Sequence, residues 1–224
     1  VNRGTNPVIE ARRREIEKAI AAETLAKLQL PSFAKMKHPK PNLWIYEIPV
    51  YTDITDTLFL ERFKTAVERI WRYQEYQPPT KIKTEAPPTF EVKLLIKPFT
   101  PKPAPKAGEK IDLNSHIRLF PKDGAVLTTG AQATHAVPNL FIAMGPQEVS
   151  ERVLAHEFGH IIGFIDGYFR GYRNRGDEGY EVLEIVPDAS DIMNNPNSGL
   201  VKKMHFEMIL ELLEAAAEKS VSKK

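Results

Sequence analysis

The sequence predicts a mixed α and β fold, and two observations lead to that class. Segments with apolar residues at helical spacing alternate with short runs rich in β-branched and aromatic residues. The 224 residues are 42% hydrophobic and 27% charged, which is enough apolar material to fill a real core. The formal net charge of +2 gives no reason to expect binding to nucleic acid.

The first half of the chain contains two predicted helices and two predicted strands. Residues 7–30 form a charged helix with an apolar stripe, and we interpret the arginines in it as a solvated face. A strand is expected at 43–51, and a helix at 53–77 whose apolar and aromatic stripe packs in the core. A second strand follows at 89–97, and the proline- and lysine-rich segment 98–110 is expected to be a surface loop.

The second half begins with short strands and ends with a helix. Three strands are predicted, at 116–120, 124–129 and 137–144. Ser150 is a candidate N-cap for the helix that follows them. Residues 167–198 are rich in Gly, Asp, Asn, Arg and Tyr and show little periodicity, so a long functional loop is expected. The last helix is predicted at 200–219.

The stretch His156 to Asp166, HEFGHIIGFID, has the spacing of a catalytic zinc site. His156 and His160 are four residues apart, so both imidazoles lie on one face of a helix. Glu157 stands beside the first histidine and can reach a metal-bound water without filling a coordination position. Gly163 can end the helix in a left-handed conformation, and Asp166 then provides an oxygen donor. Three protein ligands leave one zinc position open, which is typical of catalytic sites.

These residues resemble the metzincin clan of zinc endopeptidases, whose signature is HExxHxxGxx followed by His or Asp. A later turn carrying a methionine under the metal completes the signature, and Met193 in Ser190-Asp191-Ile192-Met193 matches it. Asp166 in the third position is similar to the snapalysin-type minority. The resemblance implies one catalytic Zn²⁺ and a peptide or protein substrate. It also implies a twisted, mostly parallel sheet with an antiparallel edge strand, an irregular lower subdomain and a C-terminal helix.

One position departs from some members of that clan. Astacin- and serralysin-like enzymes carry a tyrosine two residues after the methionine, where it helps to stabilise the oxyanion, and this chain has Asn195 there. Three tyrosines lie nearby in the sequence, Tyr168, Tyr172 and Tyr180. Nothing in the local sequence shows that one of them points at the site.

Other ligands and roles compete with this interpretation. Glu181 follows His160 at a spacing close to that of thermolysin-like enzymes, but the neighbouring Gly and Pro residues disfavour the helix that such a ligand needs. The remaining candidate nitrogen ligands, each a lone histidine, are His116, His135 and His205. Asp177 and Glu178 could bind calcium, although a solvated turn is the preferred interpretation. A metal-supported binding or toxin-effector domain without catalysis is the other alternative.

The sequence also predicts how the chain is organised. Residues 1–40 are expected to be a helical extension and residues 41–224 a single catalytic domain. No apolar run is long enough to span a membrane, and no signal peptide is visible. The absence of cysteine excludes disulfides and thiolate zinc ligands. The first residue is not Met, so we expect a part of a larger polypeptide. The family resemblance favours an exported protein, and the chain itself leaves the compartment open.

Overall fold

The structure is a computed structural model that describes residues 7–75, 87–102 and 112–221. Within these residues the main sheet has seven strands: β1 (Lys35–Lys40), β2 (Leu43–Thr52), β3 (Arg72–Gln74), β4 (Thr89–Pro98), β5 (Ala125–Thr129), β6 (His135–Val137) and β7 (Phe141–Met144). Their order is β3-β4-β2-β5-β7-β6, with β1 paired to β2. The central strands β4, β2, β5 and β7 are parallel, and β3, β6 and β1 are antiparallel to their neighbours. The expectation of a mixed fold with a mostly parallel sheet is therefore confirmed.

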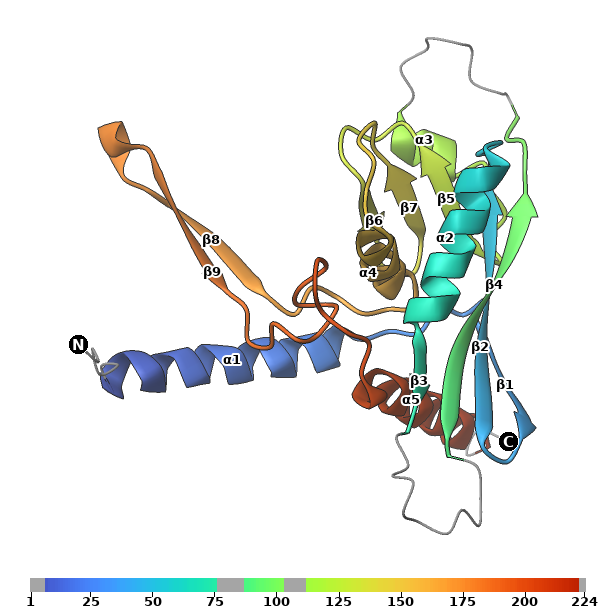
Figure 1. Ribbon diagram of the computed structural model, residues 1–224, viewed down its shortest axis with the longest axis horizontal. Helices are drawn as coiled ribbons and strands as arrows, with labels where there is room; N and C mark the ends of the chain where they lie inside the picture. The colour runs from blue at the N-terminus through green and yellow to red at the C-terminus, as the bar shows by residue number, and fades with distance from the viewer. Residues whose placement is uncertain (1–6, 76–86, 103–111, 222–224) are drawn as a thin grey trace.

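Helices α2 (Thr57–Ile70) and α4 (Glu151–Ile161) lie beside each other and cover the sheet (Figure 1). α2 begins where the Asp56 carboxylate accepts a hydrogen bond from the Phe59 N–H at 3.0 Å, which satisfies one of the free donors of the first turn. α4 contacts β6 and β7, the last two strands of the sheet order. The helix that carries the zinc motif is thus fixed against one edge of the sheet.

The core lies between these helices and the sheet. It is built from fully buried apolar side chains, the largest of which are Trp71, Tyr46, Phe63, Phe158, Phe164, Phe206, Ile48 and Leu94. The last helix, α5 (Lys203–Val221), joins this core through Phe206, whose ring stacks on Phe90 of β4 with ring centroids 5.3 Å apart. Burial of aromatic rings accounts for much of the stabilisation of such a core. The described aromatic residues of 53–77, Phe59, Phe63, Trp71 and Tyr73, therefore pack in or against the core, as expected.

Two elements extend from this body toward the same side (Figure 1). One is the helix α1 (Pro7–Lys27), and the other is a hairpin of β8 (Phe169–Asn174) and β9 (Tyr180–Ile185) with a 3-10 turn, Gly176–Glu178, at its tip. Residues 167–198, expected to be irregular, therefore contain a two-stranded ribbon. The sequence does not predict this ribbon because apolar and polar residues do not alternate regularly along 169–174.

Several other expectations are wrong in detail. Residues 116–120 are not a strand, because the short helix α3 (Leu113–Ile117) starts at Asp112, whose side chain caps Ser115. The segment 137–144 is not one strand, because Asn139 turns the chain with a φ of 59° between β6 and β7. Asn accepts this left-handed conformation more readily than most residues.

The remaining differences concern the ends of elements. The helix expected at 53–77 ends at Ile70, and Arg72–Gln74 pair with β4 instead. Residues 35–40, expected to belong to a helical extension, form β1 on the outside of β2. Most of the surface loop expected at 98–110 lies outside the described residues. Among the helices that the structure describes, none combines the length and apolarity that a membrane crossing requires.

Candidate metal centre

Helix α4 presents its histidines because its opposite side is buried. The Ser150 Oγ accepts a hydrogen bond from the Val153 N–H at 3.3 Å, which confirms Ser150 as the N-cap. Leu154 and Phe158 are completely buried against the core, so the adjacent side of the helix carries His156 and His160 toward the site. The imidazole centroids are 5.0 Å apart and the ring planes are nearly perpendicular, at 84°.

Both histidines are oriented by backbone carbonyls. His156 Nδ1 lies 2.9 Å from the Ile192 carbonyl oxygen, and His160 Nδ1 lies 2.8 Å from that of Phe164. A carbonyl only accepts hydrogen bonds, so Nδ1 carries the hydrogen in each ring. In the neutral rings Nε2 is then the unprotonated nitrogen, available as a metal ligand. The acceptors that hold the two rings, which the sequence did not name, are therefore both main-chain groups.

Gly163 ends α4 in the way the motif predicts. Its φ is +103°, and the Phe164 N–H bonds to the Gly159 carbonyl while the Gly163 N–H bonds to the His160 carbonyl. This pair of bonds is the Schellman arrangement that closes helices at a left-handed residue. The turn also places the Phe164 carbonyl against the ring of His160. The glycine thus ends the helix and positions the acceptor for the second histidine.

Gly163 meets a second constraint that the sequence does not reveal. A Cβ on this residue would overlap the Gln29 carbonyl oxygen and lie 2.9 Å from the Gln29 carbonyl carbon. The linker between α1 and β1 therefore runs directly against the glycine turn, and Leu28 beside it is buried in the core. The N-terminal segment is consequently part of the packing around the metal motif.

Asp166, which follows the turn at Gly163, is the third member of the group. Its Oδ1 lies 3.2 Å from His156 Nε2 and 3.5 Å from His160 Nε2. The next residue is tied down, because the Gly167 N–H bonds to the Met193 carbonyl at 3.1 Å. In the part of the chain that the structure describes, these three side chains are the one group of His, Cys, Asp or Glu with the spacing of a metal site.

The donor set is compatible with a zinc ion in three respects. Asp166 Oδ1 is buried and makes no hydrogen bond of acceptable geometry with the described residues, which is costly for a carboxylate oxygen unless a cation satisfies it. Tetrahedral ligands held about 2.0–2.1 Å from zinc stand about 3.3–3.4 Å from each other. The 3.2 and 3.5 Å separations to Oδ1 bracket that value. Two imidazole nitrogens and one carboxylate oxygen are also donors that zinc accepts.

The charges of the group support each other without a metal. Burial opposes the charge on His156, but Asp166 and the Ile192 carbonyl outweigh it and raise the pKa of the ring. Burial likewise opposes the charge on Asp166, yet the two imidazoles outweigh it and lower the pKa of the carboxyl group. The pKa of His160 is lowered, mainly by burial. The lowered pKa values favour the ionised carboxylate of Asp166 and the neutral ring of His160, the forms that bind a metal, whereas the raised pKa of His156 favours its protonated form, so that a metal would have to displace a proton there.

Glu157 is half-buried on the side of α4 that faces the edge strand β6. Burial raises its pKa, and the charge of Asp166 acts in the same direction. The charge of His156 opposes part of this rise, as do, to a lesser extent, nearby His135 and the Ala136 backbone, both on β6. A carboxylate with a raised pKa is a better proton acceptor at neutral pH than an ordinary glutamate. Glu157 thus has the properties of a general base beside the proposed ligands.

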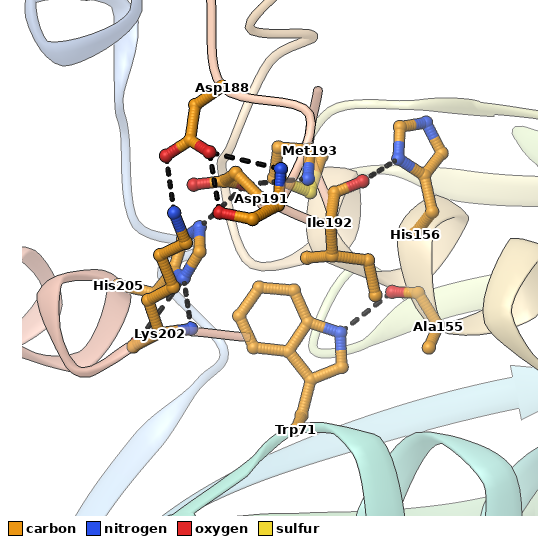
Figure 2. Close-up of polar contacts among 10 residues, drawn as sticks. Trp71, Ala155, His156, Asp188, Asp191, Ile192, Met193, Lys202 and His205 are labelled. Atoms are coloured by element: carbon orange, nitrogen blue, oxygen red, sulfur yellow. Dashed lines mark hydrogen bonds and ion pairs between the residues drawn. The ribbon is translucent and has the colours of Figure 1, made fainter. Parts of the chain in front are cut away.

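Met193 packs directly against α4 because position 159 has no side chain. A Cβ on Gly159 would overlap Met193 Sδ and lie 2.9 Å from Trp71 Cζ2. Trp71 also donates its indole N–H to the Ala155 carbonyl at 2.7 Å, so it holds α4 from the same side (Figure 2). Met193 is almost fully buried, and its role as a packing floor beneath a metal stays a prediction.

Asn195 makes its contacts within its own loop, whereas Tyr168 contacts the proposed site through Asp166. The Asn195 amide group is turned into its own loop, where it donates to the Ala189 carbonyl and to Ser198 Oγ. Tyr168 interacts with Asp166, and its own pKa is raised by burial and then by that carboxylate. The side chains of Tyr172 and Tyr180 lie outside the described part.

None of the competing ligands whose side chains are described belongs to the group of three. Glu181 is on β9, in a hairpin opposite Arg173, and not on the helix that a thermolysin-like ligand would need. His135 is exposed on β6, and His116 is buried against Asp53, with 2.7 Å between its Nε2 and Oδ2. Asp177 and Glu178 lie on the exposed hairpin tip, and no calcium cluster was found among the described residues.

The role of His205 could not be recognised from the sequence. It is buried, and its Nε2 lies 3.2 Å from Asp191 Oδ1 on the turn that carries Met193. A lone histidine on a helix gives no signal of such a contact. Asp191 in the Met-turn is evident from the sequence, and a carboxylate that becomes buried requires a partner. A search among later residues for a side chain that can carry a positive charge would therefore have suggested His205.

Comparison with known proteins adds no assignment: no family model, no curated protein and no solved structure matches this chain.

Proposed function

We propose that this chain is a zinc-dependent endopeptidase of the metzincin type. The observation that carries the proposal is the position of Asp166 Oδ1, a buried oxygen without a hydrogen-bond partner among the described residues, in front of two imidazole Nε2 atoms. His156, His160 and Asp166 would hold the ion. The rest of the motif supports this, since Gly163 ends the same helix, Glu157 stands beside His156 on it, and Met193 packs against Gly159.

The bound zinc would supply a Lewis acid that polarises the substrate carbonyl and increases the acidity of the attacking water. Glu157 would accept the proton of that water, because its raised pKa and its position beside His156 suit it to the task. The same carboxylic acid would then deliver the proton to the nitrogen of the leaving amine. The Ile192 and Phe164 carbonyls keep both imidazoles in one tautomer during these steps.

The edge strand β6 gives the substrate a place to bind. It ends the sheet order, and within the described residues no strand pairs with its outer side. An extended peptide could add to such an edge through main-chain hydrogen bonds. Glu157 lies close to His135 and Ala136 of this strand, so a peptide bound there would pass the general base. A peptide substrate is therefore favoured over a small molecule.

Two alternatives give different results in one experiment. The thermolysin-like hypothesis makes Glu181 the third ligand, and the non-catalytic hypothesis keeps the metal but not the turnover. Zinc affinity and cleavage of a peptide library are measured for the wild type, Asp166→Ala, Glu181→Gln and Glu157→Gln. We expect Asp166→Ala to lose zinc, Glu181→Gln to behave as wild type, and Glu157→Gln to keep zinc without cleavage.

Each contrary outcome has a definite meaning. Zinc binding that survives Asp166→Ala but not Glu181→Gln would replace the third ligand. Stoichiometric zinc without any cleavage by the wild type would favour the binding or effector role. Zinc binding unaffected by His156→Ala combined with His160→Ala would remove the site altogether.

A further inference from the structure

The turn that carries Met193 is held from the side opposite the metal site. Figure 2 shows His156 at one end of a series of polar contacts and His205 at the other, with Ile192 and Asp191 between them. Ile192 contributes its carbonyl to His156 Nδ1 at 2.9 Å. The position of that carbonyl therefore decides how the imidazole of His156 is oriented.

Asp191 fixes the backbone on both sides of Ile192. Its Oδ1 accepts a hydrogen bond from the Met193 N–H at 2.8 Å, and its carbonyl accepts hydrogen bonds from the N–H groups of Asn194 and Asn195. The Ile192 N–H bonds to the Leu200 carbonyl at 3.1 Å. The turn is thus built around one carboxylate, which is itself 7% exposed.

A carboxylate this deeply buried is costly unless it is paired, and His205 provides the partner. His205 lies on α5, is 2% exposed, and places Nε2 at 3.2 Å from Asp191 Oδ1. Its ring makes edge contacts with Trp71 and Phe164, with centroids 5.6 and 5.0 Å away, and those two rings stack on each other at 5.7 Å. This cluster of rings and the burial of His205 limit the freedom of its ring to turn away from Asp191.

The tautomer of His205 follows from its other nitrogen. Nδ1 accepts a hydrogen bond from the Lys202 N–H at 2.9 Å, while the Lys202 carbonyl is farther from it, at 3.3 Å. Nδ1 is therefore the acceptor, and in the neutral ring Nε2 carries the hydrogen and directs it toward Asp191. Lys202 also forms an ion pair with Asp188, which ties the start of α5 to the start of the turn.

We propose that His205 is a positioning residue for the metal site: through Asp191 it holds the Ile192 carbonyl in place, and so fixes the orientation and tautomer of His156. The inference rests on the proposed function in that it takes His156 to be a metal ligand. Groups that orient a ligand from outside the coordination sphere usually change metal affinity about 10–100-fold when they are removed. His205 acts one step farther away, so a loss of about tenfold is expected.

Three variants test the proposal. His205→Phe keeps an aromatic ring against Trp71 and Phe164 but removes the Nε2–H group. His205→Gln retains a donor near the position of Nε2 and should recover part of the affinity. Phe206→Leu is the matched control, because it removes packing from the neighbouring residue of the same helix without touching Asp191.

Two measurements are made on each folded variant. Zinc affinity is measured by competition with a chromophoric chelator. The tautomer of His156 is measured in the metal-free protein from long-range proton–nitrogen NMR spectra, at a pH where the rings are neutral. We expect about tenfold weaker zinc binding and a mixed His156 tautomer in His205→Phe, partial recovery in His205→Gln, and near wild-type values in Phe206→Leu.

The contrary result is a His205→Phe protein with wild-type zinc affinity and a single Nδ1–H tautomer at His156, which would overturn the proposal. If His205→Phe does not fold, Asp191→Asn takes its place, since it weakens the same contact without changing volume. If the wild type does not bind zinc, the proposed function fails. The tautomer measurement in the metal-free protein would still decide the role of His205.

Discussion

Gly163→Ala is the substitution for which the structure gives the most detailed expectation. Two separate costs apply at this position. An alanine at a φ of +103° has its Cβ in a strained conformation, which costs about 1–2 kcal/mol. The new Cβ would also overlap the Gln29 carbonyl oxygen, and the linker backbone would have to move. Overpacking in a buried site costs about 1–3 kcal/mol, so we expect a total loss of about 3 kcal/mol.

Gly130 provides the matched control. Its φ is +99°, nearly the same as that of Gly163, but a Cβ there would meet no atom within 4 Å. Gly130→Ala therefore carries the conformational cost without the overlap. The difference between the two variants isolates the contact with the N-terminal linker, and we expect it to be about 1–3 kcal/mol.

Urea unfolding followed by fluorescence gives the free energy of unfolding of both variants. Zinc affinity is measured in parallel, because Gly163 also positions the Phe164 carbonyl that orients His160. We expect Gly163→Ala to lose both stability and zinc affinity, and Gly130→Ala to keep its zinc affinity. Equal loss of stability in the two variants would refute the reasoning, since the Gln29 contact would then contribute nothing.

Two further predictions concern the core and the Met-turn. Tyr46 is buried, and its hydroxyl has no hydrogen-bond partner among the described residues. Tyr46→Phe should therefore leave the free energy of unfolding unchanged or raise it by about 1 kcal/mol in urea melts. A clear loss of stability would reveal an unrecognised partner of the hydroxyl. The pKa of Asp188 is lowered by Lys202 and then by Ser190, so its contribution to stability is present above the unfolded pKa of about 3.9 and disappears as the pH falls through the folded value. Urea melts should therefore show Asp188→Asn less stable than wild type at neutral pH, and the difference should shrink as the pH falls below the unfolded pKa of about 3.9; a difference independent of pH in this range would contradict this assignment.

Local signals in the sequence explain what could be predicted. The histidine spacing, the Ser150 cap and the glycine turn all operate within a few residues, so they specify α4 and its end without knowledge of the rest of the fold. Asp166 could be expected near the two rings for the same reason, because the turn at Gly163 leaves it only three residues to reach them.

Tertiary contacts explain what could not be predicted. Asp191 contacts His205, which comes 14 residues later in the sequence. Gln29 lies against Gly163, which is much farther along the chain. The hydrophobic periodicity of the sequence gives no information about such pairs. The short helix α3 resembled a strand because Ile117, Leu119 and Phe120 are apolar, while the Asp112 cap that starts it lies before the apolar run. The hairpin of β8 and β9 is specified by pairing between its strands and not by apolar alternation.

The loss of hydrolysis without loss of metal is the most direct test of the proposed peptidase. Wild type and Glu157→Gln are loaded with zinc, their metal content is measured, and both are incubated with the same peptide library. We expect equal zinc content and a rate of cleavage at least 10²-fold lower in the variant, which is about the usual contribution of a general base. Cleavage by Glu157→Gln at the wild-type rate would contradict the account.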